Sequence, residues 1–191
     1  MSRYEGVDTV VLFDEMAYED VLSTRWTALD VPVSAAYSAH LSEQNLKVLQ
    51  VCAVAESQLS ADIVDEKNPS AADLHRIEVK LNMVLEVLGQ LMAAADPRPS
   101  ASAVRFNALG AVWHQPQGMP VTGTQGLLQI YLQECLAQPL TFIVTVLGLA
   151  EDGRIRGQFA PPGEPVADLI GKLAFRRHRR QVAGIRQHLR D

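Results

Sequence analysis

The chain has 191 residues, of which 48% are hydrophobic and 20% charged, and a net charge of −5. This length suits one or two domains with a buried core, and the composition is that of a globular protein. The longest apolar run, residues 142–150, is too short to span a bilayer, and the acidic N-terminus is no secretory signal. We therefore expect a cytoplasmic protein without a membrane span.

Charge is distributed unevenly along the chain. Residues 171–191 hold seven basic residues and one acidic residue, a net charge of +6, which leaves −11 for residues 1–170. This asymmetry indicates an acidic partner, nucleic acid, or pairing of the basic tail with the acidic remainder of the same protein.

Residues that would carry catalysis or bind a metal are sparse. The two cysteines, Cys52 and Cys135, form no CxxC motif, and the five histidines are scattered without ligand spacing. No activated nucleophile or pair of catalytic carboxylates stands out. The sequence therefore predicts no enzyme, no catalytic residues, no metal site and no cofactor, and two reduced thiols fit the cytoplasm.

In chain order, the first region is an N-terminal segment, residues 1–33. Residues 8–13 (DTVVLF) are expected to form a strand, which would contribute to the sheet described below. Residues 18–26 are expected to be a helical turn or a docking segment.

The second region, residues 34–96, is expected to be a helical hairpin. Ser38 or Ser42 is the expected N-cap of its first helix, because a serine hydroxyl can accept a hydrogen bond from an amide of the first turn. Residues 65–69 (DEKNP) interrupt the pattern, since proline disfavours a helical residue before it. Two helices joined by so short a connection predict an antiparallel pair.

The second helix of this hairpin carries a heptad seam with apolar residues spaced alternately three and four apart: Leu74, Ile77, Leu81, Val84, Leu88 and Leu91. Leucine occupies the a positions, a pattern that with β-branched d residues favours parallel assemblies larger than two strands. Alternatively, the seam packs only on the preceding helix of the same chain. Because Leu85, Val87 and Met92 offer a second apolar face, we expect homo-oligomers, with a tetramer favoured over a dimer.

The third region, residues 97–191, changes to a period of two and then back to a helix. Glycine and proline separate the expected strands, and a final helix begins near residue 164. Short strands between turn signals predict a small barrel or sandwich. The expected strands are residues 104–106, 111–114, 127–133, 140–147 and 155–159.

This third region resembles the PilZ domain, a small antiparallel β-barrel followed by a C-terminal helix. The similarity lies in residues 110–113 (GAVW), 126–132 (GLLQIYL), 140–147 and 155–159 (IRGQF), and in the basic end of the closing helix. The resemblance implies an α+β fold: a PilZ-like β-barrel with a heptad-bearing helical hairpin and a C-terminal helix. If the N-terminal strand joins the barrel, the hairpin is an insertion within the domain.

Many PilZ domains bind cyclic di-GMP through an RxxxR motif before the barrel and a (D/N)xSxxG motif on its first strands. If Gly110 is the glycine of the second motif, Asn107 stands at its serine position and Arg105 at its Asp/Asn position. Upstream, Arg98 stands alone, and bidentate recognition of phosphate needs more than one exposed arginine. We therefore expect no cyclic di-GMP binding; the alternative is a rearranged site that uses these residues.

Four arginines of the closing helix, Arg176, Arg177, Arg179 and Arg180, are a candidate docking surface for an unidentified protein partner. A solvated helix end that complements the helix dipole is the alternative. Nucleic-acid binding is a third interpretation, weakened by the acidic chain and by the lack of interleaved aromatic residues beyond Phe175. Together these features favour a non-catalytic PilZ-like adaptor, and the resemblance implies a setting in bacterial signalling such as pilus or motility control and virulence.

Overall fold

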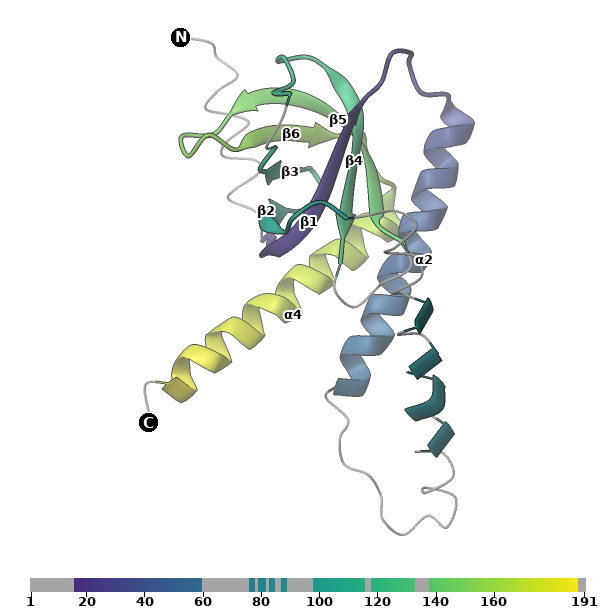
Figure 1. Ribbon diagram of the computed structural model, residues 1–191, viewed down its shortest axis with the longest axis vertical. Helices are drawn as coiled ribbons and strands as arrows, with labels where there is room; N and C mark the ends of the chain where they lie inside the picture. The colour runs from purple at the N-terminus through teal and green to yellow at the C-terminus, as the bar shows by residue number, and fades with distance from the viewer. Residues whose placement is uncertain are drawn as a thin grey trace.

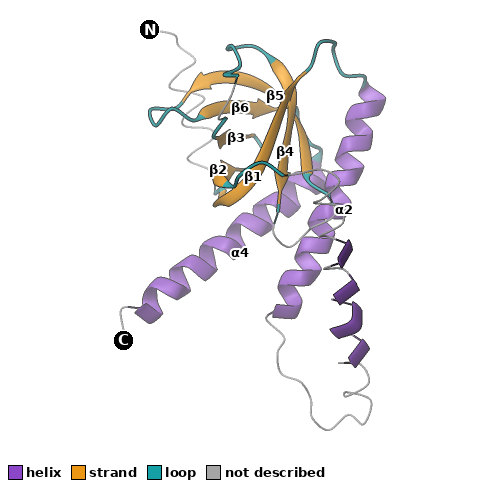
Figure 2. Ribbon diagram, in the orientation of Figure 1, coloured by secondary structure: helices purple, strands orange, loops and turns teal. Residues whose placement is uncertain are grey.

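The computed structural model describes residues 16–59, 98–115, 118–132 and 138–188, and, within the second helix of the hairpin, residues 76–77, 79–81, 83–84 and 87–88. Six strands close into an antiparallel barrel in the order β1-β2-β3-β6-β5-β4. Two long helices pack against this barrel and diverge below it (Figures 1 and 2). The strands are β1 Tyr18–Ala28, β2 Ser102–Phe106, β3 Gly110–Trp113, β4 Gln125–Tyr131, β5 Leu140–Leu149 and β6 Ile155–Phe159; the helices are α2 Ala35–Leu59 and α4 Glu164–His188.

The five strands expected in the third region are confirmed with small shifts at their ends, and the closing helix begins at Glu164 as expected. The fold is therefore the expected α+β barrel with helices. Its interior is built from alternate residues of every strand, such as Val104, Leu128 and Val144, all fully buried. The barrel centre is crowded: a Cβ on Gly157 would lie 2.9 Å from the ring of Trp113 and closer still to Val144.

β1 corrects the expectation for residues 18–26, which form a strand and not a helical turn. Tyr18 and Leu22 are each only 1% exposed and alternate with outward-facing residues. Polar Asp20 stands at an inward position between them and polar Thr24 at the next inward position after Leu22, which hides the period of two in the sequence. The strand expected at residues 8–13 lies outside the described residues.

β1 is shared between two neighbours along its length. Tyr18–Leu22 pairs with β2, whereas Ser23–Ala28 pairs with β4. Because β1 precedes α2 and β2 follows residue 97, the segment that begins with α2 is inserted between two adjacent strands of the barrel.

α2 begins one turn earlier than expected, because Ser34 and not Ser38 or Ser42 provides the cap. The Tyr37 amide donates to Ser34 Oγ at 3.2 Å. The helix lays a buried stripe of Leu41, Val48, Leu49 and Cys52 against the rest of the molecule. Its lower half extends below the barrel, and the helical residues between 76 and 88 are drawn along it in Figure 1. We call α2 and these residues the arm.

The β5–β6 turn is held by one local ion pair. The backbone amide of Arg154 donates to Asp152, and Arg154 Nε lies 2.6 Å from Asp152 Oδ2. These hydrogen bonds, that of the amide first, hold the pKa of the Asp152 carboxyl below its usual value. The Asp152 side chain is half exposed, so we expect the pair to fix the turn and add little to stability.

Candidate functional site

The arm presents apolar side chains to solvent in the single chain. Four of the seam residues are described, and all are about half exposed or more: Ile77 61%, Leu81 56%, Val84 55% and Leu88 49%. Leu74 and Leu91 lie outside the described residues. Hence the packing within the chain leaves about half or more of the surface of these four residues accessible to solvent. A row of exposed aliphatic residues at heptad spacing is a surface that a second helix can cover.

The arm carries more exposed apolar surface than the seam alone. Val79, Met83 and Val87 follow one another at four-residue spacing, and each is at least half exposed. Val51 and Val54 add two exposed residues on α2. Of these five, only Val87 was singled out as part of a second face; the i, i+4, i+8 spacing was the signal for Val79 and Met83.

Asn107 and Gly110 form the turn between β2 and β3. Asn107 is 3% exposed, and its Oδ1 accepts hydrogen bonds from the amides of Leu109 at 2.9 Å and Gly110 at 3.1 Å. The Asn107 amide donates in turn to the Gly110 carbonyl at 3.0 Å. The Asn107 oxygen is therefore committed to shaping this turn, which is the usual role of a short amide side chain in a loop.

Arg98 and Arg105 are not brought together. The guanidinium of Arg98 lies over the ring of Tyr131, with 5.1 Å between its carbon and the ring centroid. Tyr131 pairs with Ser23 of β1, and Arg105 pairs with Glu19. Ser23 and Glu19 are four positions apart on β1, which corresponds to about 13 Å along an extended strand. The two arginines thus occupy different parts of the barrel surface.

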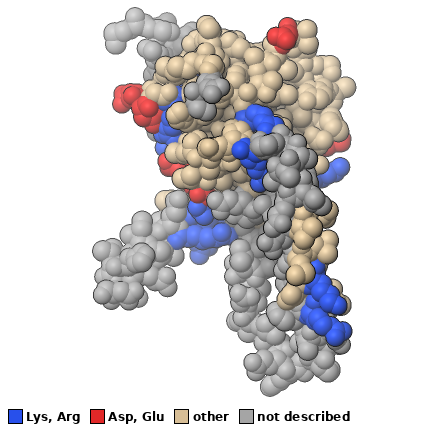
Figure 3. All heavy atoms as spheres, viewed as in Figure 1, with Lys and Arg blue, Asp and Glu red and all other residues tan. Residues whose placement is uncertain are grey.

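Of the four arginines of α4 predicted as a docking surface, one binds the barrel and three are exposed. The helix buries Val166, Ile170, Leu173 and Ala174, and Arg177 continues this face onto Asp20 of β1. Arg177 Nη2 lies 2.6 Å from Asp20 Oδ2, which also accepts the Tyr18 hydroxyl at 3.1 Å. Arg177 is therefore an internal anchor between α4 and β1, and it is not part of the docking surface predicted from the sequence. Arg176, Arg179 and Arg180 remain exposed. Figure 3 shows a group of cationic side chains on α4 just below the barrel.

Asp20→Asn is expected to lower the free energy of unfolding by about 1–3 kcal/mol, because it leaves the partly buried Arg177 without its carboxylate. Chemical denaturation followed by circular dichroism measures this loss. Asp168→Asn is the matched control: Asp168 also pairs with a cation of α4, Lys172 at 2.7 Å, but both side chains are 58% exposed. That change is expected to cost less than about 0.5 kcal/mol. Equal losses in the two variants would contradict the anchor.

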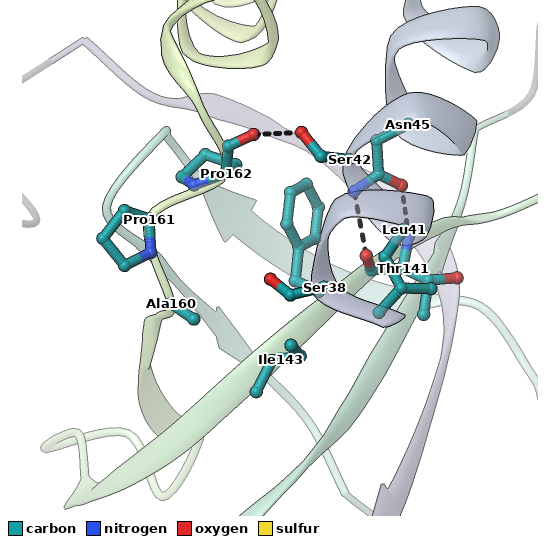
Figure 4. Close-up of a pocket in the computed structure, with 10 residues that line it drawn as sticks. Ser38, Leu41, Ser42, Asn45, Thr141, Ile143, Ala160, Pro161 and Pro162 are labelled. Atoms are coloured by element: carbon teal, nitrogen blue, oxygen red, sulfur yellow. Dashed lines mark hydrogen bonds between the residues drawn. The ribbon is translucent and has the colours of Figure 1, made fainter. Parts of the chain in front are cut away.

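A joint connects the arm, the barrel and α4 (Figure 4). Asn45 of α2 is 2% exposed; its Nδ2 donates to the Thr141 carbonyl and its Oδ1 accepts from the Thr141 amide, each at 2.8 Å. β6 pairs with β5 only from Val144 onward, so the Asn45 amide takes the place of a strand at the start of β5. One turn earlier, Ser42 Oγ donates to the Pro162 carbonyl in the segment that leads into α4.

The described residues contain no group of three or more His, Cys, Asp or Glu side chains placed to hold a metal ion. They also contain no helix that is long and apolar enough to cross a membrane.

Comparison with known protein families gives one match, over residues 48–187, to the atypical PilZ domain, described as a cyclic di-GMP receptor. The chain belongs to this family. The match runs from the middle of α2 to near the end of α4, so it includes the second half of α2, the helical residues between 76 and 88, and strands β2 to β6 of this atypical PilZ domain. A comparison with curated proteins found no match.

Among solved structures, the atypical PilZ domain is similar to a pathogenic protein from Xanthomonas campestris. The two are 24% identical with a TM-score of 0.74, over 96% of this chain and 99% of the other. That protein is described as a tetrameric PilZ domain self-assembled via an unusual helical bundle. At this identity the similarity establishes the fold, and here it extends beyond the barrel to nearly the whole chain.

Proposed function

We propose that this atypical PilZ domain is a self-assembling adaptor, in which the arms of four copies associate through the seam. The observation that carries the proposal is the exposure of Ile77, Leu81, Val84 and Leu88 in the single chain. Burying the exposed part of each side chain contributes about 1–2 kcal/mol. The Xanthomonas relative, whose described assembly is a tetramer through a helical bundle, supports the same use of the arm.

A tetramer accounts for the arm better than a dimer does. A two-stranded coiled coil covers the a and d positions, whereas the exposed Val87 stands at a g position of the same heptads. Larger bundles cover more of each helix, so they also bury residues that flank the seam. Four arms would carry four barrels and four α4 helices, which raises avidity for a partner with several binding sites.

We propose further that the adaptor works in the bacterial cytoplasm, in signalling such as pilus or motility control and virulence, through protein partners and without cyclic di-GMP. The separation of Arg98 from Arg105 supports this, since a dinucleotide phosphate is best held by guanidinium groups that converge on it. The committed oxygen of Asn107 supports it as well. The second candidate is a cyclic di-GMP receptor with a rearranged site, which the family description favours.

Light scattering on the purified chain, with and without cyclic di-GMP, tests both proposals when combined with calorimetric titration of the dinucleotide. We expect a mass near four times 20.9 kDa that the nucleotide does not change. We also expect no binding tighter than about 1 mM. A monomer would remove the assembly proposal, and micromolar binding would replace the non-binding proposal by the receptor.

A further inference from the structure

The outward face of α4 combines cations with one exposed aromatic ring. At 100° per residue, Lys172, Phe175, Arg176 and Arg179 share one face of the helix, opposite the face that carries Ile170 and Leu173 into the core. Lys172 also pairs on this face with Asp168, at 2.7 Å, through two exposed side chains that a partner's carboxylate can reach. Phe175 is 49% exposed, and the guanidinium carbon of Arg179 lies 5.8 Å from the centroid of its ring. The exposed ring therefore adds an apolar contact beside the cations of this face.

The anchor at Arg177 fixes the direction of this face. Arg177 is bound to Asp20 of β1, and α4 continues for eleven more residues to His188. Figure 1 shows this part of the helix running away from the barrel. An isolated helix of this length is marginally stable in water. A partner that lies along the outward face would therefore stabilise the helix as well as bind it.

We propose that the outward face of α4, made of Lys172, Phe175, Arg176 and Arg179, docks an acidic amphipathic helix of a partner protein. The inference rests on the proposed adaptor function and names the chemistry of its partner. Cations at i, i+4 and i+7 match carboxylates at the same spacing on a second helix. Arginine pairs with carboxylates in a bidentate way, and Phe175 meets an aliphatic residue between them.

A protein partner fits this face better than an extended polyanion does. The chain carries −11 outside residues 171–191, which repels a long polyanion, whereas a short acidic helix contacts the local positive face alone. Arginine and aromatic residues together are also the composition enriched at protein interfaces. The single aromatic residue offers too little stacking surface for successive bases.

Fluorescence anisotropy with two labelled peptides of about 15 residues tests the proposal on the full-length chain. One peptide places glutamates at i, i+4 and i+7 with a leucine between them; the other has the same composition in scrambled order. We expect the patterned peptide to bind at least about tenfold more tightly than the scrambled one. Arg176→Glu with Arg179→Glu, and separately Phe175→Ala, are expected to remove this preference.

Lys47→Glu, which reverses one charge at an exposed position on α2, is the control for charge away from α4 and is expected to leave peptide binding unchanged. Equal binding of the two peptides would overturn the proposal, since it would show charge attraction without recognition. Binding of single-stranded DNA, or of vesicles with anionic phosphatidylglycerol, that depends on Arg179 while the patterned peptide does not bind would also overturn it. Light scattering on the same samples reports the assembly independently, so a failed docking face and a failed tetramer are distinguishable.

Discussion

Leu81→Asp and Leu88→Asp are each expected to convert the proposed tetramer into particles of one or two chains. In a bundle, either change places four carboxylates at one level of an apolar core, where desolvation and mutual repulsion cost far more than one leucine layer contributes. Both side chains are about half exposed in the single chain, so the monomer tolerates the same changes. Light scattering at matched concentrations measures the mass.

Gln50→Asp is the control for this experiment, because it adds the same charge at an exposed position of the arm outside the seam. It is expected to leave the mass unchanged. Trp113, which is fully buried in the barrel, reports by its fluorescence whether a dissociated variant is still folded. A mass equal to that of the unmodified chain in both leucine variants would refute assembly through the seam.

Asn45→Leu is expected to lower the free energy of unfolding by about 3 kcal/mol, since it leaves the amide and the carbonyl of Thr141 without their partner. For a chain of this size that corresponds to a fall in melting temperature of roughly 6–12 °C. Thermal unfolding followed by circular dichroism measures it. Asn45→Asp is expected to cost at least as much, because a carboxylate keeps the acceptor but faces the Thr141 carbonyl without a proton to donate.

Gln50→Leu provides the comparison for Asn45→Leu, since it replaces an exposed amide on the same helix with the same aliphatic side chain. Its effect is expected to stay within about 0.5 kcal/mol. If Asn45→Leu melted within about 1 °C of the unmodified chain, Asn45 would not stabilise the joint between α2 and β5.

The sequence predicted well those elements whose period is uninterrupted. β6 matches its expected bounds, and β2 to β5 differ by one or two residues at most ends, because apolar side chains alternate along them and glycine or proline bounds them. β1 was mispredicted because Asp20 and Thr24 stand at inward positions. Asp20 is tolerated there by Arg177, more than 150 residues later, and no local pattern can reveal that pairing.

The residues of the candidate site likewise fall into those that the sequence could predict and those that it could not. The seam is a property of spacing, and the exposure of its four described residues agrees with the use predicted for it. Arg177, Asn45 and Asn107 depend instead on the group that each one meets: the distant Asp20 carboxylate, the distant Thr141 backbone and the amides of the β2–β3 turn, respectively. From sequence alone, Arg177 was indistinguishable from its neighbours on α4. The structure separates them because one helix face is covered and the other is not.

The insertion of the arm between β1 and β2 has a consequence for the order of folding. Closing the barrel at this point requires Leu22 to meet Ser102, a separation of about 80 residues, and such non-local pairings form slowly. Helices form far sooner, from contacts within each helix. Newly made chains would therefore present apolar arms while their barrels are still open. In a cell, the concentration of nascent chains would then decide when the copies assemble. Assembly would start either after each barrel has closed, or earlier, when a strand of one chain can pair with the open barrel of another.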